Sequence, residues 1–307
     1  MEKKTPKAFI VHHEADADGR LSGLVAAMNF IDKGYDVVPI GWDYWMDPSN
    51  LIYILDNSRT GEEDVLVMTD ISLKLEYMES LLVSSVHEFA DFIWIDHHKT
   101  AIEELECLNL TGLRVDGTAA CELAWEFFYN SKIPYAIELA GQYDVWRKNG
   151  KFDWDRFVIP FQYFLKSIDL KIDAKGSGVV ERISDSVFNC DIDRYAIPAG
   201  ELIMSFAKKE AEKAKFFEVE FEGIKFLAVN QIGGSTLFEF AGKSGDSLMA
   251  FSYVGRDKVK FSMYEGNVPT DLSVIAKKWG GGGHAKACGF EVQSNQANSI
   301  FKGVFKK

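Results

Sequence analysis

The segment IWIDHHKT, residues 93–100, ends a short apolar run on an acid and two consecutive histidines. The apolar residues 93–95 are typical of a buried strand, and Asp96, His97 and His98 follow at once. Adjacent side chains on a strand point to opposite faces, so at most one of the two histidines can continue the strand's pattern. The segment therefore predicts the end of a strand at a sheet edge, where polar side chains turn into a cleft.

Apolar strands alternate with helical patterns through the first half of the chain. Strands are predicted at 8–13, 35–42, 64–72 and 91–98, and helices at 19–34, 74–86, 118–130 and 133–148. Thr118 is the expected N-cap of the third helix. Such alternation is typical of an α/β fold with a doubly wound, mainly parallel sheet. Ligands bind at the carboxyl ends of the strands in these sheets, so polar residues that end several strands are expected to meet at one edge.

The second half of the chain has a different pattern. A chain of 307 residues is too long for one ordinary core, so two domains are expected. The stretch 197–223 predicts a long helix that connects them, and short strands follow from about residue 217. We therefore expect three parts in the chain: a first domain at 1–190, a helical linker at 191–216, and a smaller α/β domain at 217–307.

The composition is that of a globular protein, with 47% hydrophobic residues, 26% charged residues and a net charge of −12. Proteins that grip long nucleic acids through phosphates normally present a basic surface, so long nucleic acid is not an expected partner. No segment reaches the roughly 18 apolar residues of a spanning helix, and no signal peptide or membrane anchor is expected. The four cysteines are scattered, which favours reduced thiols in the cytoplasm: Cys107, Cys121, Cys190 and Cys288.

Three predicted strands end in residue types that bind metal ions, and one helical pattern adds another. The residues are His12, Asp16, Asp18, Asp70, Asp96, His97, His98 and Asp144. Histidine and carboxylate ligands without thiolates suit Mn²⁺, Mg²⁺ or Fe²⁺ better than structural zinc. The number of acids indicates two ions, which can clamp an in-line displacement at phosphorus. Each motif alone is also typical of a helix cap or a solvated turn, and only their convergence at one edge favours a metal site.

The motifs also occur in a recognisable order. The pattern H-x-x-x-D-x-D-G at 12–19, then TDIS at 69–72, DHHKT at 96–100 and YDVW at 143–146 resembles the DHH phosphoesterase superfamily. The segment GGGGHAKACGF at 280–290 resembles the G-G-G-H-x-x-A-x-G signature of the associated DHHA1 domain. Together the motifs cover nearly the whole chain. The resemblance implies a phosphoesterase with its active site in the cleft between two domains.

The resemblance implies two Mn²⁺ ions, with Mg²⁺, Co²⁺ or Fe²⁺ as alternatives. Its ligands would be His12 and Asp16 for one ion, Asp18, His97 and Asp144 for the other, and Asp70 for both. His98 would face the substrate phosphate or its leaving group, and Asp96 would orient a histidine. His13 competes with His12 for the ligand role, and the spacing to Asp16 favours His12.

The glycine run and a tyrosine are the candidate substrate-binding residues of the second domain. Consecutive glycines let backbone N–H groups approach a phosphate, although a glycine run alone is also typical of a linker. The resemblance implies that the distal end of the substrate contacts Gly281, Gly282, Gly283 and His284. Tyr264 stands where many relatives carry an arginine. It could stack on a base, donate one hydrogen bond or pack in the core, but it lacks the bidentate grip of arginine.

The expected substrate is small, because the chain is acidic and has no added nucleic-acid-binding barrel. The resemblance implies hydrolysis of short oligoribonucleotides and linear dinucleotides to nucleoside monophosphates, often accompanied by activity on 3′-phosphoadenosine 5′-phosphate (pAp). An exopolyphosphatase or pyrophosphatase is the alternative enzyme, although polyphosphate would be expected to prefer a basic channel. A catalytically silent nucleotide sensor is the alternative of another class, and the complete ligand set disfavours it. The resemblance also suggests a homodimer.

Overall fold

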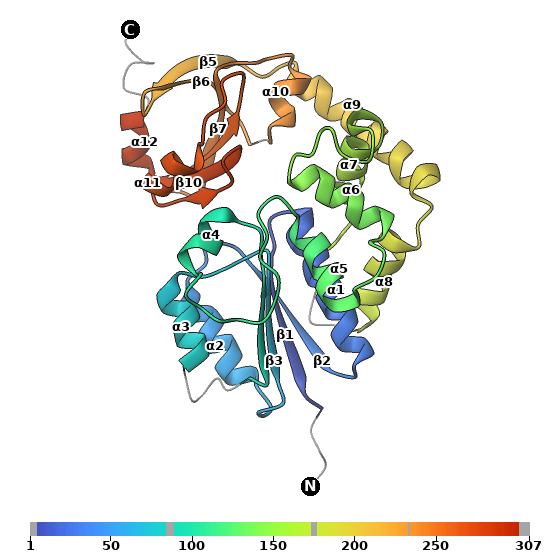
Figure 1. Cartoon of the computed structure of the whole chain (residues 1–307). Coiled ribbons are helices and arrows are strands. Elements are labelled where there is room, and N and C mark those ends of the chain that lie inside the picture. The colour runs from blue at the N-terminus through green and yellow to red at the C-terminus, as the bar shows by residue number, and fades with distance from the viewer. Residues whose placement is uncertain (1–4, 84–88, 173–176, 233, 301–307) are drawn as a thin grey trace. The chain divides into compact units, whose positions relative to one another are not determined.

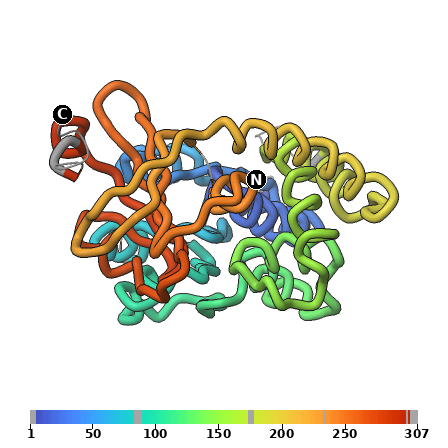
Figure 2. Tube along the Cα trace, turned by 90° about the horizontal axis from the view of Figure 1, so that it is seen from above, coloured from blue at the N-terminus to red at the C-terminus, as the bar shows by residue number. Residues whose placement is uncertain are grey.

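The structure is a computed structural model that describes residues 5–83, 89–172, 177–232 and 234–300. The chain divides into two compact units, Met1–Ile203 and Met204–Lys307 (Figure 1). The helix α9 (Ile197–Ala211) carries the chain from the first unit into the second (Figure 2). The boundary between the units therefore falls inside the segment 191–216.

The first unit is built on a four-stranded parallel sheet with the order β2-β1-β3-β4. Its strands are β1 (Lys7–His13), β2 (Asp36–Trp42), β3 (Val65–Thr69) and β4 (Asp91–Ile95). Helices α1 (Ala17–Asp32) and α5 (Ala120–Tyr129) lie on one side of the sheet, and α2 (Pro48–Ser58) and α3 (Leu75–Val83) on the other (Figure 1). The predicted α/β fold with a parallel sheet is confirmed.

The central strand β1 is buried on both faces. Its residues 8–11 have no exposed surface, because helices cover the sheet from both sides. Parallel strands in such a position are apolar throughout rather than alternating, which is the pattern of AFIV in the sequence. On the α2 and α3 side, Phe9 and Trp94 lie in one buried cluster with Leu51 and Met78.

The sheet reverses its direction of growth at β1. Strand β2 is added on one side of β1, whereas β3 and then β4 are added on the other. In open parallel sheets, ligands bind at the carboxyl ends of the strands that flank such a reversal. Here β1 ends at His13 and β3 ends at Thr69, directly before Asp70. The topology therefore brings these residues to the place where a ligand site is expected.

The remaining helices of the first unit follow β4. They are α4 (Lys99–Glu104), α6 (Tyr135–Asp144), α7 (Ile159–Ser167) and α8 (Ser177–Phe188), with π-helical turns at Trp154–Val158 and Ile192–Ala196. Helix α6 ends four residues before the predicted end at 148, so Asp144 is its last residue. The end of the predicted helix 74–86 lies outside the described residues, which include α3 up to Val83.

The predicted long helix 197–223 is wrong in its second part. Helix α9 ends at Ala211, and strand β5 (Phe216–Phe221) begins five residues later. The physical reason is the alternation in FFEVEF, in which Val219 and Phe221 are buried while Glu218 and Glu220 are exposed. This period of two suits a half-buried strand and not a helix.

The second unit contains a six-stranded mixed sheet with the order β5-β6-β7-β8-β10-β9. The other strands are β6 (Ile224–Asn230), β7 (Ser247–Val254), β8 (Lys258–Glu265), β9 (Gly282–Gly283) and β10 (Ala287–Gln293). Its helices are α10 (Thr236–Phe240), α11 (Ser273–Lys278) and α12 (Ser294–Ile300). The core includes Phe261 and Phe290, whose rings stack with centroids 4.9 Å apart. This unit thus has a hydrophobic core of its own.

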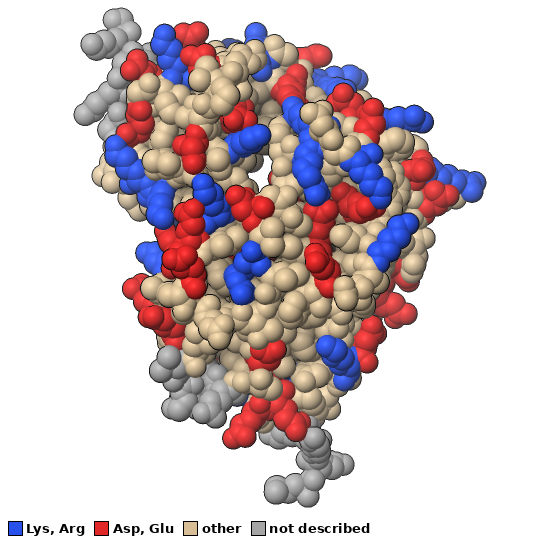
Figure 3. All heavy atoms as spheres, in the orientation of Figure 1, with Lys and Arg blue, Asp and Glu red and all other residues tan. Residues whose placement is uncertain are grey.

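The surface carries charges of both signs. On the face drawn in Figure 3, lysine and arginine side chains are interspersed with acidic ones. Among the described residues, no helix combines the length and the apolar character needed to cross a membrane.

Candidate metal centre

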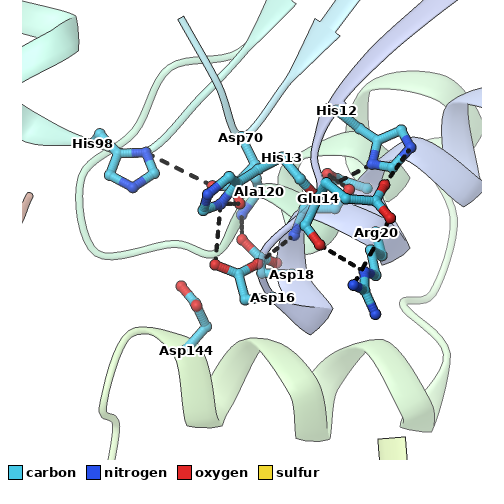
Figure 4. Close-up of polar contacts among 12 residues, drawn as sticks. His12, His13, Glu14, Asp16, Asp18, Arg20, Asp70, His98, Ala120 and Asp144 are labelled. Atoms are coloured by element: carbon cyan, nitrogen blue, oxygen red, sulfur yellow. Dashed lines mark hydrogen bonds and ion pairs between the residues drawn. The ribbon is translucent and has the colours of Figure 1, made fainter. Parts of the chain in front are cut away.

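The ends of several elements of the first unit bring histidines and acids together (Figure 4). Three groups of donor atoms each lie within 4.8 Å of one another: His13, Asp16 and Asp70; Asp18, His97 and Asp144; and Asp70, Asp96 and His98. These residues lie at or just after the ends of β1, β3 and β4, in the first turn of α1 and at the end of α6. Of the eight residues predicted for the site, the structure brings seven together, and His12 is the exception.

Asp70 lies at the middle of the centre. Its Oδ2 is 3.4 Å from Nδ1 of His13, and its Oδ1 is 3.1 Å from Nε2 of His97. The two oxygens of one carboxylate therefore face two different groups of donors. His13 Nδ1 is also 3.1 Å from Oδ2 of Asp16, and His97 Nε2 is 3.4 Å from Oδ2 of Asp144. A carboxylate in this position can be shared by two cations.

The backbone of Asp70 is unusual as well. Its φ is +59°, in the left-handed region that residues other than glycine rarely adopt. Its N–H donates to the carbonyl oxygen of Ile95 at 2.9 Å, which ties the end of β3 to the end of β4. Strained backbone of this kind persists where the surroundings enforce it, and it is concentrated at functional sites. The fold therefore maintains both a strained backbone and a buried charge at Asp70.

The structure brings His13, and not His12, to the acids. His12 is fully buried on the opposite side of β1, and a Cβ added to Gly23 of α1 would lie 2.7 Å from its Cγ. Its Nε2 is 3.8 Å from Oε2 of Glu14 (Figure 4). Successive residues of a strand face opposite sides, so only the last residue of β1 can turn into the site. The preference for His12, which rested on its spacing to Asp16, is therefore not supported by the geometry.

Asp18 is held in place by helix α5. Its Oδ2 accepts a hydrogen bond from the backbone N of Ala120 at 2.8 Å, and its Oδ1 accepts one from the N of Cys121 at 2.9 Å. The prediction of Thr118 as the N-cap of this helix is wrong, because Ala119 occupies the cap position. Asp18, from a distant part of the chain, accepts the hydrogen bonds of the first two N–H groups of the helix. The same Oδ2 lies 3.5 Å from Nε2 of His97, so one side chain serves both the helix and the centre.

Asp96 orients the histidines beside it. It is fully buried, and its Oδ1 accepts hydrogen bonds from the backbone N–H groups of His97 at 2.7 Å and His98 at 3.1 Å. The same oxygen lies 2.8 Å from Nδ1 of His98, and Oδ2 accepts a bond from Nε1 of Trp94 at 3.2 Å. This is the contact expected of an orienting carboxylate. It leaves the opposite ring nitrogen of His98, Nε2, directed away from Asp96.

The crowding of charges changes the pKa values of the centre. Burial raises the pKa of Asp18 to about 7, and the neighbouring Asp70 carboxylate acts in the same direction. Burial also raises the pKa of Asp144 well above its usual range. Burial alone would lower the pKa of His13, but the carboxylates of Asp16 and Asp70 outweigh it and raise this pKa to about 11. In the metal-free protein, protons therefore provide part of the positive charge that the carboxylates require.

The donor set fits divalent cations. Ligand atoms about 2.1 Å from a common octahedral ion lie about 3 Å apart when they are adjacent. The distances of 3.1–3.5 Å between His13 or His97 and the neighbouring carboxylate oxygens are close to this value. Imidazole and carboxylate donors suit Mn²⁺, Mg²⁺ and Fe²⁺. Within the part of the chain that the structure describes, no cysteine belongs to these donor groups.

The glycine run of the second unit belongs to the sheet and not to a linker. Strand β9 pairs with β10, and a Cβ at Gly281 would lie 2.0 Å from the carbonyl oxygen of Gly289. Gly283 has a φ of +123°, which favours glycine. The backbone N of His284 donates to the carbonyl oxygen of Ala287 at 2.8 Å and closes a tight turn. Close strand approach and backbone conformation thus require glycine here, whether or not a ligand binds.

Tyr264 packs within the second unit. It lies on β8 opposite Leu248 of β7, and its ring centroid is 6.4 Å from that of Phe238. It also contacts the buried cluster that contains Val229 and Ala250. Of the roles considered for this tyrosine, packing is the one that these contacts support.

Tyr44 is part of the site but was not expected from the sequence. It lies in the loop after β2, and its ring centroid is 5.6 Å from that of His13 and 6.2 Å from that of His98. The sequence does carry one sign of Tyr44, which is its position: DYW, residues 43–45, directly follows a strand that ends at the same edge of the sheet.

Comparison with known proteins supports a DHH phosphoesterase. No family model matches the chain. The chain is 26% identical over 309 residues to oligoribonuclease NrnB of Bacillus subtilis, covering 92% of this chain and 73% of that protein. It is 25% identical over 244 residues to an uncharacterized protein of Acanthamoeba polyphaga mimivirus, covering 73% of this chain and 52% of that protein. The match to an oligoribonuclease over 92% of this chain confirms the resemblance to the DHH phosphoesterases.

A solved structure of similar fold is that of RecJ from Thermus thermophilus in complex with Mn²⁺. The TM-score is 0.50 at 13% identity, and the match covers 96% of this chain but only 51% of RecJ. At this identity the likeness shows the fold alone.

Proposed function

We propose that the first unit binds two divalent cations, Mn²⁺ in the first place, and hydrolyses short oligoribonucleotides and linear dinucleotides to nucleoside monophosphates. The observation that carries the proposal is the arrangement around Asp70. Its two buried carboxylate oxygens face separate groups of histidine and aspartate donors, 3.4 Å and 3.1 Å away. The carboxylate oxygens within each group lie within 4.8 Å of one another, and they repel each other unless cations or protons lie between them.

The proposed ligands follow the geometry of the three strand ends. They are His13 and Asp16 for one cation, Asp18, His97 and Asp144 for the other, and Asp70 for both. Two divalent cations held there would act as Lewis acids and would supply an activated water for the reaction. Mg²⁺, Co²⁺ or Fe²⁺ could substitute for Mn²⁺, because the donors are nitrogen and oxygen atoms.

Hydrogen bonds within the first unit prepare this chemistry. The hydrogen bonds from Ala120 and Cys121 fix the Asp18 carboxylate, so little reorganisation is needed when a cation binds. Asp96 lies 2.8 Å from Nδ1 of His98 and orients its ring, and we assign to Nε2 a contact with the substrate phosphate or its leaving group. Attack of water on phosphorus breaks the bond to the leaving ribose oxygen, and that oxygen then takes a proton. We assign the donation of this proton to Nε2 of His98.

The substrate class is proposed from the relative and from the charge of the chain. A relative that matches 92% of this chain is named an oligoribonuclease. The net charge of −12 does not favour binding along a long nucleic acid or a polyphosphate chain. We also propose that the enzyme hydrolyses pAp as a second substrate. For the second unit, we propose that His284 and the backbone of Gly281, Gly282 and Gly283 bind a further substrate phosphate, with Tyr264 in a packing role.

A hydrolysis panel tests the proposal. The purified full chain is assayed with Mn²⁺ against a diribonucleotide, linear pGpG, pAp and tripolyphosphate, with a chelator as the control. The expected result is cation-dependent release of nucleoside monophosphates from the dinucleotides. Preference for tripolyphosphate would replace the proposal with an exopolyphosphatase. Nucleotide binding without hydrolysis of any of the four would indicate a sensor.

A further inference from the structure

The loop after β2 places two aromatic side chains in solvent. Tyr44 is 54% exposed and Trp45 is 57% exposed. Strand β2 is parallel to β1, so this loop lies at the same edge of the sheet as His13. Aromatic side chains with an open face are the groups on which proteins stack nucleobases. Tyr44 and Trp45 are therefore both candidates for contact with a base.

Tyr44 is the one that contacts the centre. Its ring meets the ring of His13 at an interplanar angle of 60° and that of His98 at 80°, both edge-to-face. The loop is anchored by Asp43, whose Oδ1 accepts a hydrogen bond from the backbone N of Tyr44 at 2.8 Å and lies 4.0 Å from Nε2 of His13. Tyr44 thus forms a wall of the centre while half of its surface stays open.

We propose that Tyr44 is a specificity-determining residue whose ring stacks on the base of the nucleoside attached to the scissile phosphate. The inference rests on the proposed function, since it requires a nucleotide whose phosphate lies among His13, His98 and Asp70. A base attached through its ribose to that phosphate comes beside a ring only 5.6 Å and 6.2 Å from the two histidine rings.

Stacking of this kind has a defined selectivity. Every base has a π-face, so an aromatic platform distinguishes a substrate with a base from one without, but discriminates little among bases. This suits an enzyme that degrades short oligoribonucleotides of any sequence. It also separates such an enzyme from one that acts on phosphoanhydrides, in which a base platform has no use.

The test compares ligands with and without a base. Binding of adenosine 5′-monophosphate and of ribose 5-phosphate is measured in the presence of Mn²⁺ for the wild type, Tyr44→Phe and Tyr44→Leu. Tyr53→Leu is the matched control, because Tyr53 is an exposed tyrosine on α2. We expect Tyr44→Leu to weaken binding of the nucleotide roughly 5- to 150-fold and to leave ribose 5-phosphate unchanged. Tyr44→Phe and Tyr53→Leu should resemble the wild type.

Several outcomes would overturn the inference. Equal weakening of both ligands by Tyr44→Leu, or a loss of Mn²⁺ affinity in the same variant, would mean that the ring merely supports the histidines. A loss in Tyr44→Phe as large as in Tyr44→Leu would assign the role to the hydroxyl group. If the wild-type protein hydrolyses no dinucleotide but Tyr44→Leu still weakens binding of the nucleotide and not of ribose 5-phosphate, the proposed hydrolysis is refuted and the base contact is supported. If the wild-type protein hydrolyses dinucleotides but shows no base-dependent binding, the proposed hydrolysis is supported and the base contact is refuted.

Discussion

The acid–histidine centre of the first unit and the glycine run of the second unit differ in what the fold requires of them. At Gly281 and Gly283, close strand approach and a positive φ account for glycine without any ligand. At Asp70, a buried carboxylate on a strained backbone serves no packing purpose. Burying a charge costs folding free energy that partners must offset, and the partners of Asp70 are histidines of the same centre, so such a group indicates a ligand more strongly than a glycine does. A motif is therefore best evidence of function where the fold has no other use for its residues.

Asp70→Ala gives the largest expected effect. It removes the one carboxylate that both proposed cations share, so hydrolysis of a dinucleotide should fall by about three orders of magnitude or more with every cation. Thermal unfolding in the presence of chelator should show a lower stability than that of the wild type, because His13 and His97 lose the carboxylate that stabilises their protonated forms. Wild-type turnover with Mn²⁺ in this variant would refute a shared carboxylate.

The two histidines at the end of β1 give the next effect. His13→Ala should weaken Mn²⁺ binding by tenfold or more, because it removes a proposed ligand 3.1 Å from Asp16 and 3.4 Å from Asp70. His12→Ala should largely keep Mn²⁺ affinity and instead lower the free energy of unfolding by about 1–3 kcal/mol, since it empties a fully buried position. Metal titration and urea unfolding of both variants measure this. The reverse ranking of metal affinities would restore the assignment made from spacing.

The sequence was sufficient for much of the first unit. Continuous apolar runs that end in acids or histidines identified β1, β3 and β4, and the parallel topology then places their ends at one edge. This is why the sequence alone predicts Asp16, Asp70 and His97 as residues of the site. Their place in the fold follows from element order, which a sequence pattern encodes well.

Other features depend on single residues or on distant contacts. The choice between His12 and His13 depends on which residue ends the strand, and a shift of one residue reverses the face. The cap of α5 comes from Asp18, more than a hundred positions earlier in the chain, so the local pattern at Thr118 gave no sign of it. Tyr44 lies in a loop whose conformation depends on tertiary contacts. Local patterns carry none of this information.

His284→Ala probes the second unit. If His284 donates a hydrogen bond to a substrate phosphate, kcat/KM for a dinucleotide should fall roughly tenfold to a hundredfold. The small ester bis-p-nitrophenyl phosphate should lose less activity, and Mn²⁺ content should not change. Gly281→Ala is the contrasting variant, because its Cβ would clash with the carbonyl oxygen of Gly289 and should reduce stability instead. Equal losses on both substrates in His284→Ala would assign the residue to the fold.

The pH dependence of cation binding gives the smallest and most graded effect. In the metal-free protein the pKa of Asp18 is raised to about 7 and that of His13 to about 11, so at neutral pH both hold protons that a cation must displace. Mn²⁺ affinity should therefore rise by about tenfold per pH unit for each proton released, and calorimetry in buffers of different ionisation enthalpy should detect the release.

The stability of the metal-free protein should change in the opposite sense. An acid whose pKa is higher in the folded state than in the unfolded state holds more protons when folded, so the free energy of unfolding falls as pH rises from about 4 to 7. Asp18→Asn should flatten that slope, whereas His12→Ala should leave proton release intact. Mn²⁺ binding without proton release between pH 6 and 8 would show that the cation binds outside this centre.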